Sequence, residues 1–201
     1  MAEKKMTTRQ KQAIESRRKL LEAATELFNE KGYQETGVQE ICVHAGLSVG
    51  VFYHYFNSKQ ELLQAILRSK NDELMELIAT ESTARTHLEA LLEVLGFVCR
   101  QKVEGSFAMV CTSFTPSPDG SAAPDPKLLE FLASIVRSAQ EAGELTGDTA
   151  PEQIAFDMLI ASRGYQLYWC ESGGGFDVLA GQREYLKRLL RAYLGPNGVI
   201  G

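Results

Sequence analysis

Short segments with periodic apolar positions alternate with turn-forming residues along the first third of the chain. Apolar side chains recur at three- and four-residue steps from about Ile14 to Lys31, and Gly32 stands where a helix C-terminus often needs glycine. Two shorter periodic segments follow at Val38–Ala45 and Val49–Phe56, and a longer one begins after the polar residues 57–58. This pattern predicts four helices, with a tight turn between the second and the third.

The remainder of the chain also has helical periodicity, and no alternating strand pattern of useful length is present. Residues 105–114 are apolar but too short to assign, and residues 115–126 hold four of the six prolines, which predicts a loop. We therefore expect an all-α protein with about nine helices. The later helices are predicted at His87–Val103, Lys127–Ala142, Pro151–Glu171 and Val178–Leu194.

Residues 36–63 have the pattern of a helix-turn-helix that enters DNA. Gly46 supplies the turn, and Ser48 can cap a second short helix. Phe52 can face inward on that helix, whereas Val49, Tyr53 and His54 point elsewhere. An exposed Val-Tyr-His surface on so short a helix is better suited to reading a DNA groove than to forming a core.

Charge is distributed unevenly along the chain, whose net charge is −5. Residues 1–70 hold eleven lysines and arginines against eight acidic residues, which leaves ten against eighteen for residues 71–201. A basic N-terminal part on an acidic body suits contact with phosphate at one end. Residues 1–13 read as a flexible arm. Its basic side chains either enter a neighbouring minor groove or attract phosphate non-specifically, and we favour the second reading: Lys4, Lys5, Arg9 and Lys11.

Composition and the absence of motifs argue against several other classes of protein. The chain is 44% apolar and 23% charged, lacks an apolar run long enough to cross a membrane, and has no secretory signal at its N-terminus, so a cytoplasmic location is expected. Four widely spaced cysteines without a CxxC pair, and three histidines without companion ligands, predict no metal. We expect no cofactor, and the absence of hydrolase, metalloprotease, P-loop and dinucleotide motifs predicts that the protein is not an enzyme.

The segment RRKLLEAATELFNEKGYQETGVQEICVHAGLSVGVFYHYFNSKQELL resembles the N-terminal signature of the TetR family of bacterial transcriptional regulators. Three blocks carry the resemblance, which covers about residues 16–63. They comprise Ala23, Ala24, Leu27, Phe28, Gly32 and Tyr33; Ala45, Gly46, Leu47 and Ser48; and Tyr53, Phe56, Ser58, Lys59 and Leu62.

The resemblance implies a ligand-responsive regulator, most often a repressor, that binds a palindromic DNA operator as a homodimer. A small hydrophobic or amphipathic inducer in the body would release the DNA. We divide the chain into an arm and helix-turn-helix domain at residues 1–60 and a ligand-binding and dimerisation domain at residues 61–201. A regulator that senses oxidants or electrophiles through cysteine (Cys99 or Cys111), or a helical protein-interaction module without specific DNA binding, remains an alternative.

Matching the family pattern residue by residue assigns Tyr53 and Lys59 to phosphate contact, with Arg17 as a further backbone contact. Two positions depart from the pattern: Gly37 stands where a hydroxyl usually caps the second helix, so that Thr36 either replaces it or the contact is absent, and Val51 also replaces a hydroxyl. The full set of predicted DNA-binding residues is Arg17, Thr36, Gly37, Ser48, Val49, Gly50, Val51, Tyr53, His54 and Lys59.

Two further sets are predicted in the body. Adaptable apolar shapes suggest a ligand pocket, with packing as the alternative for each residue: Phe97, Met109, Phe114, Phe131, Tyr165 and Trp169. Polar residues flanked by apolar ones could orient a ligand or be exposed charges: Glu104, Asp157 and Arg163. Small and apolar stripes on the last two long helices suggest a dimer interface, with monomer core as the alternative: Ala161, Gly164, Leu186, Leu189, Leu190 and Tyr193.

Overall fold

A computed structural model describes residues 8–81, 84–104, 107–116 and 123–200. The described residues form nine α-helices and one short 3-10 helix, and they contain no β-strand, which confirms the predicted all-α class. The helices are α1 (Thr8–Lys31), α2 (Val38–Ala45), α3 (Val49–Tyr55), α4 (Lys59–Glu81), α5 (His87–Val103), α6 (Phe107–Thr112), α7 (Pro126–Glu141), α8 (Pro151–Glu171) and α9 (Val178–Leu190), followed by the 3-10 turn η1 (Arg191–Tyr193).

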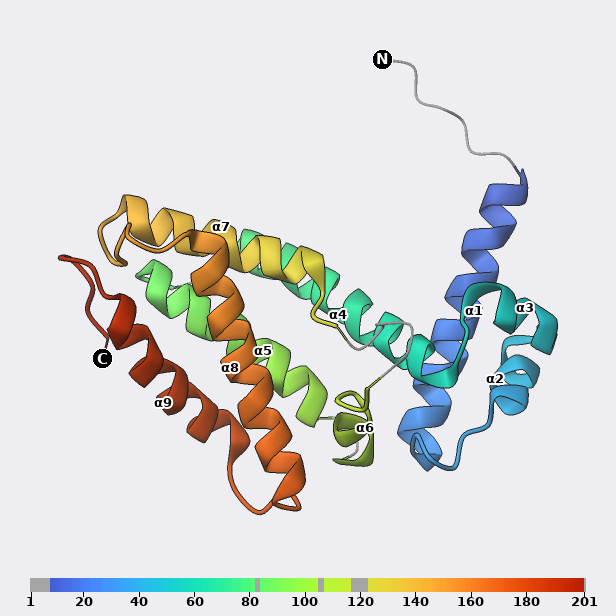
Figure 1. Ribbon diagram of the computed structural model, residues 1–201. Helices are drawn as coiled ribbons and strands as arrows, with labels where there is room; N and C mark the ends of the chain where they lie inside the picture. The colour runs from blue at the N-terminus through green and yellow to red at the C-terminus, as the bar shows by residue number, and fades with distance from the viewer. Residues whose placement is uncertain (1–7, 82–83, 105–106, 117–122, 201) are drawn as a thin grey trace.

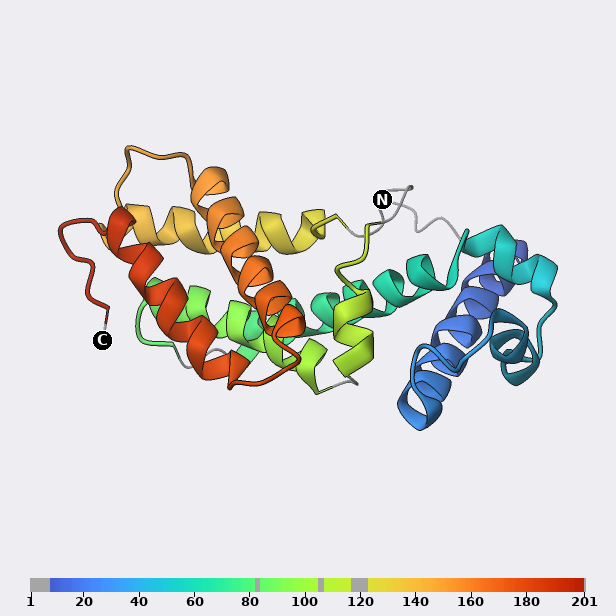
Figure 2. The same ribbon diagram turned by 60° about the horizontal axis from the view of Figure 1, so that its bottom comes forward.

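The helices form a small head and a larger body joined by α4 (Figure 1). In the head, α1 packs against α2, α3 and the start of α4, whereas the body is built from α5, α7, α8 and α9 with the rest of α4. Both ribbon views place α6 on the side of the body that faces the head (Figure 2). The two ends of the described chain lie far apart, with α1 in the head and η1 at the opposite end of the body (Figure 1).

Two separate apolar cores stabilise these parts. The head core contains Leu20, Phe28, Ile41 and Phe52, all essentially inaccessible, and it extends along α4 as far as Leu67. The body core gathers leucines, valines and alanines of α5, α7, α8 and α9. The first two turns of α4 thus belong to the head core, beyond residue 60. The division of the chain into residues 1–60 and 61–201 remains a prediction.

Caps explain most of the helix boundaries. The hydroxyl of Thr86 accepts a hydrogen bond from the Glu89 amide at the start of α5, and the Asp177 carboxylate accepts from two amides at the start of α9. Asp125 caps α7 in the same way and is followed by Pro126 in the first turn. Three predicted helices agree with the structure at both ends: Val38–Ala45, His87–Val103 and Pro151–Glu171.

The predicted flexible arm over residues 1–13 is partly wrong. Helix α1 begins at Thr8, so Lys11 lies on an exposed helical surface rather than in an arm. An exposed helical residue is held relative to the head, whereas an arm residue could reach into a groove. Lys4 and Lys5 lie outside the described residues, and only the helical backbone of Arg9 is described.

Candidate nucleic-acid interface and interior cavity

The turn between α2 and α3 holds the two short helices in a fixed relation. Gly46 has a φ of 66°, a left-handed conformation that costs glycine little. Its amide donates to the Val43 carbonyl at 3.1 Å, and the Leu47 amide donates to the Cys42 carbonyl at 2.9 Å. This pair of bonds is the Schellman arrangement that ends helices, and it directs the chain into α3.

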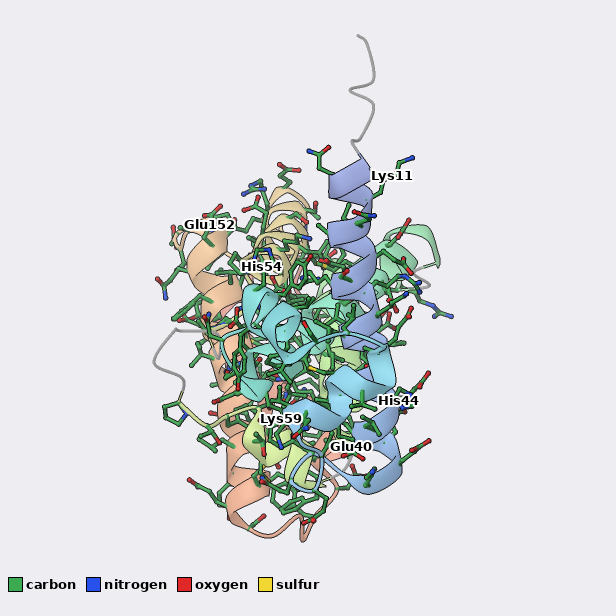
Figure 3. All side chains as sticks on the ribbon, turned by 90° about the vertical axis from the view of Figure 1, so that its right-hand side faces the viewer. Lys11, Glu40, His44, His54, Lys59 and Glu152 are labelled. Atoms are coloured by element: carbon green, nitrogen blue, oxygen red, sulfur yellow. The ribbon has the colours of Figure 1, made fainter. Side chains whose placement is uncertain are left out.

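Helix α3 buries one side and exposes the other. Phe52 is fully buried in the head core, and the Ser48 hydroxyl accepts a hydrogen bond from the Val51 amide at the start of the helix. Val49, Tyr53 and His54 are exposed, with Tyr53 showing 56% of its surface. The predicted reading surface of α3 is therefore open to a partner. Figure 3 looks at this end of the molecule, with His54 and Lys11 toward its top and Lys59 toward its bottom.

The prediction that Thr36 contacts DNA is wrong. Its side chain is 1% exposed, and its hydroxyl donates to the carbonyl oxygen of Gly32 at 2.8 Å, with Leu27 as a second acceptor at 3.3 Å. The hydroxyl closes the C-terminal end of α1 and is not available to phosphate. Gly37 precedes α2 with an extended backbone and no side-chain cap, so the hydroxyl contact expected at the start of α2 is absent on both residues.

Lys59 is half-buried, and its ammonium donates to the carbonyl oxygens of Tyr33 at 2.6 Å and Thr36 at 2.7 Å. It also lies 4.2 Å from the centre of the Tyr33 ring. Burial lowers the pKa of Lys59, against the opposing effect of Glu35. Arg17 is exposed and stacks over the Phe56 ring at 5.3 Å. Lys59 thus connects α4 to the loop before α2, a role that its sequence pattern did not reveal.

Among the residues predicted to form the ligand pocket, those whose side chains are described lie in different surroundings. Phe97 is 39% exposed, Phe131 packs on the outside of the body core, and Tyr165 stacks on Tyr185 with centroids 5.4 Å apart. Trp169 donates its indole N–H to the Phe176 carbonyl at 3.0 Å. The side chain of Met109 lies outside the described residues. Helical spacing alone could not distinguish packing positions from pocket positions, because both are apolar.

A polar cavity instead lies in the body where α4, α5 and α8 meet the start of α7. Its volume is about 30 Å³, which is enough for a water molecule. Three basic side chains and one carboxylate line it: Arg68, Lys102, Arg163 and Asp125. Apolar walls come from Leu67, Val98, Leu128 and Leu159.

Lys102 and Arg163 approach the same aromatic ring from their two helices. The Lys102 ammonium lies 5.0 Å from the centre of the Phe114 ring, and the Arg163 guanidinium carbon lies 5.4 Å from it. Burial lowers the pKa of Lys102 to about 8, and the charge of Arg163 acts in the same direction. Burial also lowers the pKa of Arg163. Phe114, one of the predicted ligand residues, therefore lies beside the cations of the cavity.

A buried chain of amides borders the cavity. The Gln182 amide nitrogen donates to the Leu95 carbonyl at 3.2 Å, and Gln166 donates to the Gln182 oxygen at 3.0 Å and to the Ser162 hydroxyl at 3.1 Å. The sequence analysis did not single out these residues. The available signal was a pair of polar positions, Ser162 and Gln166, four residues apart and therefore on one face of the predicted helix.

Comparisons with known proteins agree with this geometry. A family profile described as "Bacterial regulatory proteins, tetR family" matches residues 20–66. The HTH-type transcriptional repressor KstR2 of Rhodococcus jostii is 39% identical over 193 residues, which cover 90% of this chain and 92% of the relative. The chain belongs to the TetR family.

Two further comparisons extend the TetR assignment. The HTH-type transcriptional regulator UidR of Escherichia coli is 27% identical over 149 residues, covering 71% of this chain and 76% of the relative. The crystal structure of Thermus thermophilus FadR, a TetR-family repressor in complex with lauroyl-CoA, has a TM-score of 0.70 at 24% identity and covers 92% of this chain and 98% of that one. This TetR protein is therefore a helix-turn-helix transcriptional regulator and not an enzyme. None of its described helices combines the length and the apolar character needed to span a bilayer.

Two residues predicted for a dimer interface belong to the core of this TetR chain. Leu186 is 1% exposed and Leu190 is 0% exposed, so neither side chain has free surface for a partner. Leu189 and Tyr193 pack against the same core, and the Tyr193 hydroxyl donates to Asp157 at 2.7 Å. Gly164, in contrast, is exposed on α8, and Ala161 is half-buried. Large apolar side chains around Gly164 are also exposed: Phe156, Ile160, Leu167 and Tyr168.

Three of the four thiols, those of Cys42, Cys99 and Cys170, do not have the environment of a reactive cysteine. Burial raises the pKa of Cys99 to about 11 and, with the neighbouring Cys111, that of Cys170 to about 12. Burial also raises the pKa of Cys42. A raised pKa reduces the thiolate fraction at neutral pH, and the thiolate is the nucleophile. The environment of Cys99 therefore does not support its predicted alternative role as a redox or electrophile sensor.

Proposed function

We propose that this TetR regulator is a repressor that binds a palindromic operator in the cytoplasm as a homodimer and leaves it when a small molecule occupies the body. The observation that carries the proposal is α3, whose Val49, Tyr53 and His54 are exposed on a helix fixed by the Gly46 turn and the Phe52 core contact. A helix held in this way can enter a major groove, where base edges differ between sequences.

The exposed apolar face of α8 supports the homodimer. Phe156, Ile160, Leu167 and Tyr168 are each exposed by 41–60%, and with the exposed Gly164 between them they follow three- and four-residue steps along α8. Such a stripe is costly in water and is typical of a helix that packs against a partner. A two-fold dimer would present its two α3 helices to two half-sites, which is why a palindromic operator is expected.

Ligand responsiveness is supported by the cavity in the body and by contacts that join its surroundings to the head. The Gln64 amide donates to the Ser113 carbonyl at 3.0 Å, and the Gln60 amide donates to the Thr115 carbonyl at 2.6 Å. Both glutamines lie in the part of α4 next to the head core. A change at Phe114 could thus displace the start of α4, and the similar fold of the FadR repressor with lauroyl-CoA is consistent with a ligand in the body.

A gel-shift and footprinting experiment tests the proposal. Full-length protein should protect a palindromic segment of the DNA upstream of its own gene, and excess random duplex should not compete. Light scattering on the same sample should give the mass of a dimer. A strictly monomeric protein, or equal affinity for the upstream DNA and random DNA at low salt, would refute it.

A further inference from the structure

Two cysteines from different helices meet where α6 packs against the C-terminal end of α8 (Figures 1 and 2). The thiols of Cys111 on α6 and Cys170 on α8 share a hydrogen bond, and both side chains are half-buried and free of any disulfide. Because a disulfide needs two sulfur atoms that the fold already holds close together, this pair has the first requirement for one.

The packing of aromatic rings keeps α6 in this place independently of the thiols. The Phe107 ring, one helical turn before Cys111, lies edge-on against the Trp169 ring with centroids 5.1 Å apart. Gly174 follows α8 with a φ of 76°, and a Cβ atom built there would lie 3.2 Å from the Phe107 ring. The glycine thus allows α6 to approach the end of α8 closely, which brings Cys111 to Cys170.

The other two cysteines lie in different surroundings. Cys42 is 1% exposed in the head core, and Cys99 is 0% exposed on α5. The charged groups that affect the pKa of Cys99 are Lys102 and Asp177 and not a second thiol. The hydrogen-bonded thiol pair therefore consists of Cys111 and Cys170.

We propose that Cys111 and Cys170 form a dithiol that a hydroperoxide converts reversibly into a disulfide, which joins α6 to α8. Cys111 is the attacking sulfur. Burial, together with the hydrogen bond to Cys111, raises the pKa of Cys170 to about 12, so Cys170 keeps its proton in the reduced protein.

The reaction needs only the two thiols and the hydroperoxide. The Cys111 thiolate attacks the O–O bond, so that an S–O bond forms, the O–O bond breaks, and the departing alkoxide takes up the Cys111 proton and leaves as an alcohol. The Cys170 sulfur then attacks the sulfenic acid of Cys111. An S–S bond forms, the S–O bond breaks, and hydroxide leaves with the Cys170 proton as water. The two thiols lose two electrons, and the hydroperoxide gains them.

The surroundings of Cys170 suit this second step. Part of its raised pKa comes from the negative charge of Cys111, and that part disappears once Cys111 is an uncharged sulfenic acid. The charge of Lys102 acts in the opposite direction to burial and favours the thiolate of Cys170. Oxidation of Cys111 therefore makes Cys170 a better nucleophile than it is in the reduced protein.

The disulfide would also change the contacts between the body and the head. Its sulfur atoms lie about 2.05 Å apart, closer than hydrogen-bonded atoms, so α6 must move toward α8. Ser113 and Thr115 follow α6 directly, and their carbonyls accept from Gln64 and Gln60 of α4. We expect the oxidised protein to bind its operator about tenfold more weakly or less, within the range of ordinary allosteric coupling. This effect rests on the proposed repressor function, whereas the disulfide does not.

Peptide mapping of the full-length wild-type protein tests the inference. The reduced protein is treated with hydrogen peroxide or cumene hydroperoxide, denatured, alkylated and digested with trypsin, which cleaves after Lys127 and Arg163 and so separates the two cysteines. We expect the Cys111 and Cys170 peptides to be joined, the Cys42 and Cys99 thiols to be alkylated, and dithiothreitol to reverse the change. Four alkylated thiols, a different pairing, or a sulfinic acid at Cys111 without a disulfide would overturn the inference.

Serine variants assign the order of the two steps. Cys170→Ser should leave a sulfenic acid at Cys111 that dimedone traps, whereas Cys111→Ser should give no trapped product at Cys170. Cys99→Ala is the matched control and should form the disulfide as the wild type does. Circular dichroism and melting temperature check that each variant is folded, and the wild-type peptide map needs no variant. Equal trapping in the two serine variants would contradict the assignment of Cys111 as the attacking sulfur.

Operator binding by the same preparations separates the inference from the proposed function. Specific DNA binding by a protein that forms no disulfide would refute the dithiol site alone. A disulfide in a protein without specific DNA binding would refute the repressor function and leave the site in place. Complete disulfide formation with unchanged operator affinity would overturn the expected effect on the head.

Discussion

The ammonium of Lys59 donates a hydrogen bond of 2.7 Å to the carbonyl oxygen of Thr36. With its second bond to Tyr33, this contact connects the first residue of α4 to the loop that precedes α2. Two of its three N–H groups are used by these carbonyls, which leaves one for the predicted phosphate contact.

Replacing Lys59 with methionine should therefore affect stability and DNA binding together. Two charge-assisted bonds to carbonyls are lost, so we expect the free energy of unfolding to fall by about 1–3 kcal/mol in a urea titration. Binding to all DNA sequences should weaken, and the slope of log affinity against log salt should fall by about one. Lys127→Met, on the body, should change neither quantity. Unaltered stability of Lys59→Met would contradict the structural part of this prediction.

His54 tests sequence reading by α3. It is exposed and packs edge-on against Tyr55 with ring centroids 4.9 Å apart, so its removal should leave the head core intact. His54→Ala should change the order of preference among operator variants by about 1–3 kcal/mol at one base pair. The comparison is His44→Ala on α2, which pairs with Glu26 at 2.7 Å. Equal loss on every operator variant would show that His54 only contributes affinity.

Gly37 offers a gain of function. Its φ of −94° and ψ of 152° suit any residue, and a Cβ atom built there meets no atom within 4 Å. Gly37→Ser should cap α2 and raise the free energy of unfolding by a few tenths of a kcal/mol. The new hydroxyl should also strengthen operator binding, measured by gel shift. Gly37→Ala has the added Cβ without the hydroxyl, so a similar increase in affinity with alanine would rule out this explanation.

Ile160 probes the proposed dimer. It is 42% exposed at the centre of the apolar face of α8, and a two-fold axis there would place two copies close together. Ile160→Glu would bury unpaired like charges, which costs about 3–5 kcal/mol and corresponds to a loss of at least about 100-fold in dimer affinity. Val199→Glu, at a position that is 77% exposed, is the control. A fully dimeric Ile160→Glu protein by light scattering would place the interface elsewhere.

The buried ammonium of Lys102 should lower the stability of the folded protein. Because burial and Arg163 lower the pKa of Lys102 to about 8, its charged form is penalised in the folded state. Lys102→Met should raise the free energy of unfolding at pH 7 by about 1 kcal/mol, even after loss of the contact with Phe114. Between pH 8 and the ordinary lysine pKa, the unfolded wild type binds more protons than the folded one, so wild-type stability rises with pH. The advantage of the variant should therefore shrink above pH 8 in urea titrations at several pH values, and an advantage that grows with pH would contradict the assignment.

Local signals in the sequence predicted most of the fold and the exposed side of α3. The Gly46 turn, the Ser48 cap and the inward Phe52 follow from residue types at fixed spacing, and the structure shows each of them. Thr36 could not be placed in this way, since a hydroxyl beside a helix start can face either phosphate or a carbonyl. Only the position of the end of α1 decides between the two.

The body was harder to predict because its sites depend on distant parts of the chain. Lys102 comes from α5, Asp125 from the loop before α7 and Arg163 from α8, and no sequence spacing brings them together. The stripe on α9 looks the same whether it faces its own core or a partner, and Leu186 and Leu190 face the core. The exposed face of α8 could not be identified from the sequence either, because this helix has apolar residues on nearly every side.

The bonds from Gln60 and Gln64 end on main-chain oxygens of Thr115 and Ser113, not on side chains. A carbonyl oxygen survives almost any amino-acid replacement at its own position. These hydrogen bonds between α4 and the body can therefore persist while the side chains around them change in evolution. Homologues that diverge from this chain could therefore bind different ligands while they keep the same contacts between the body and the head.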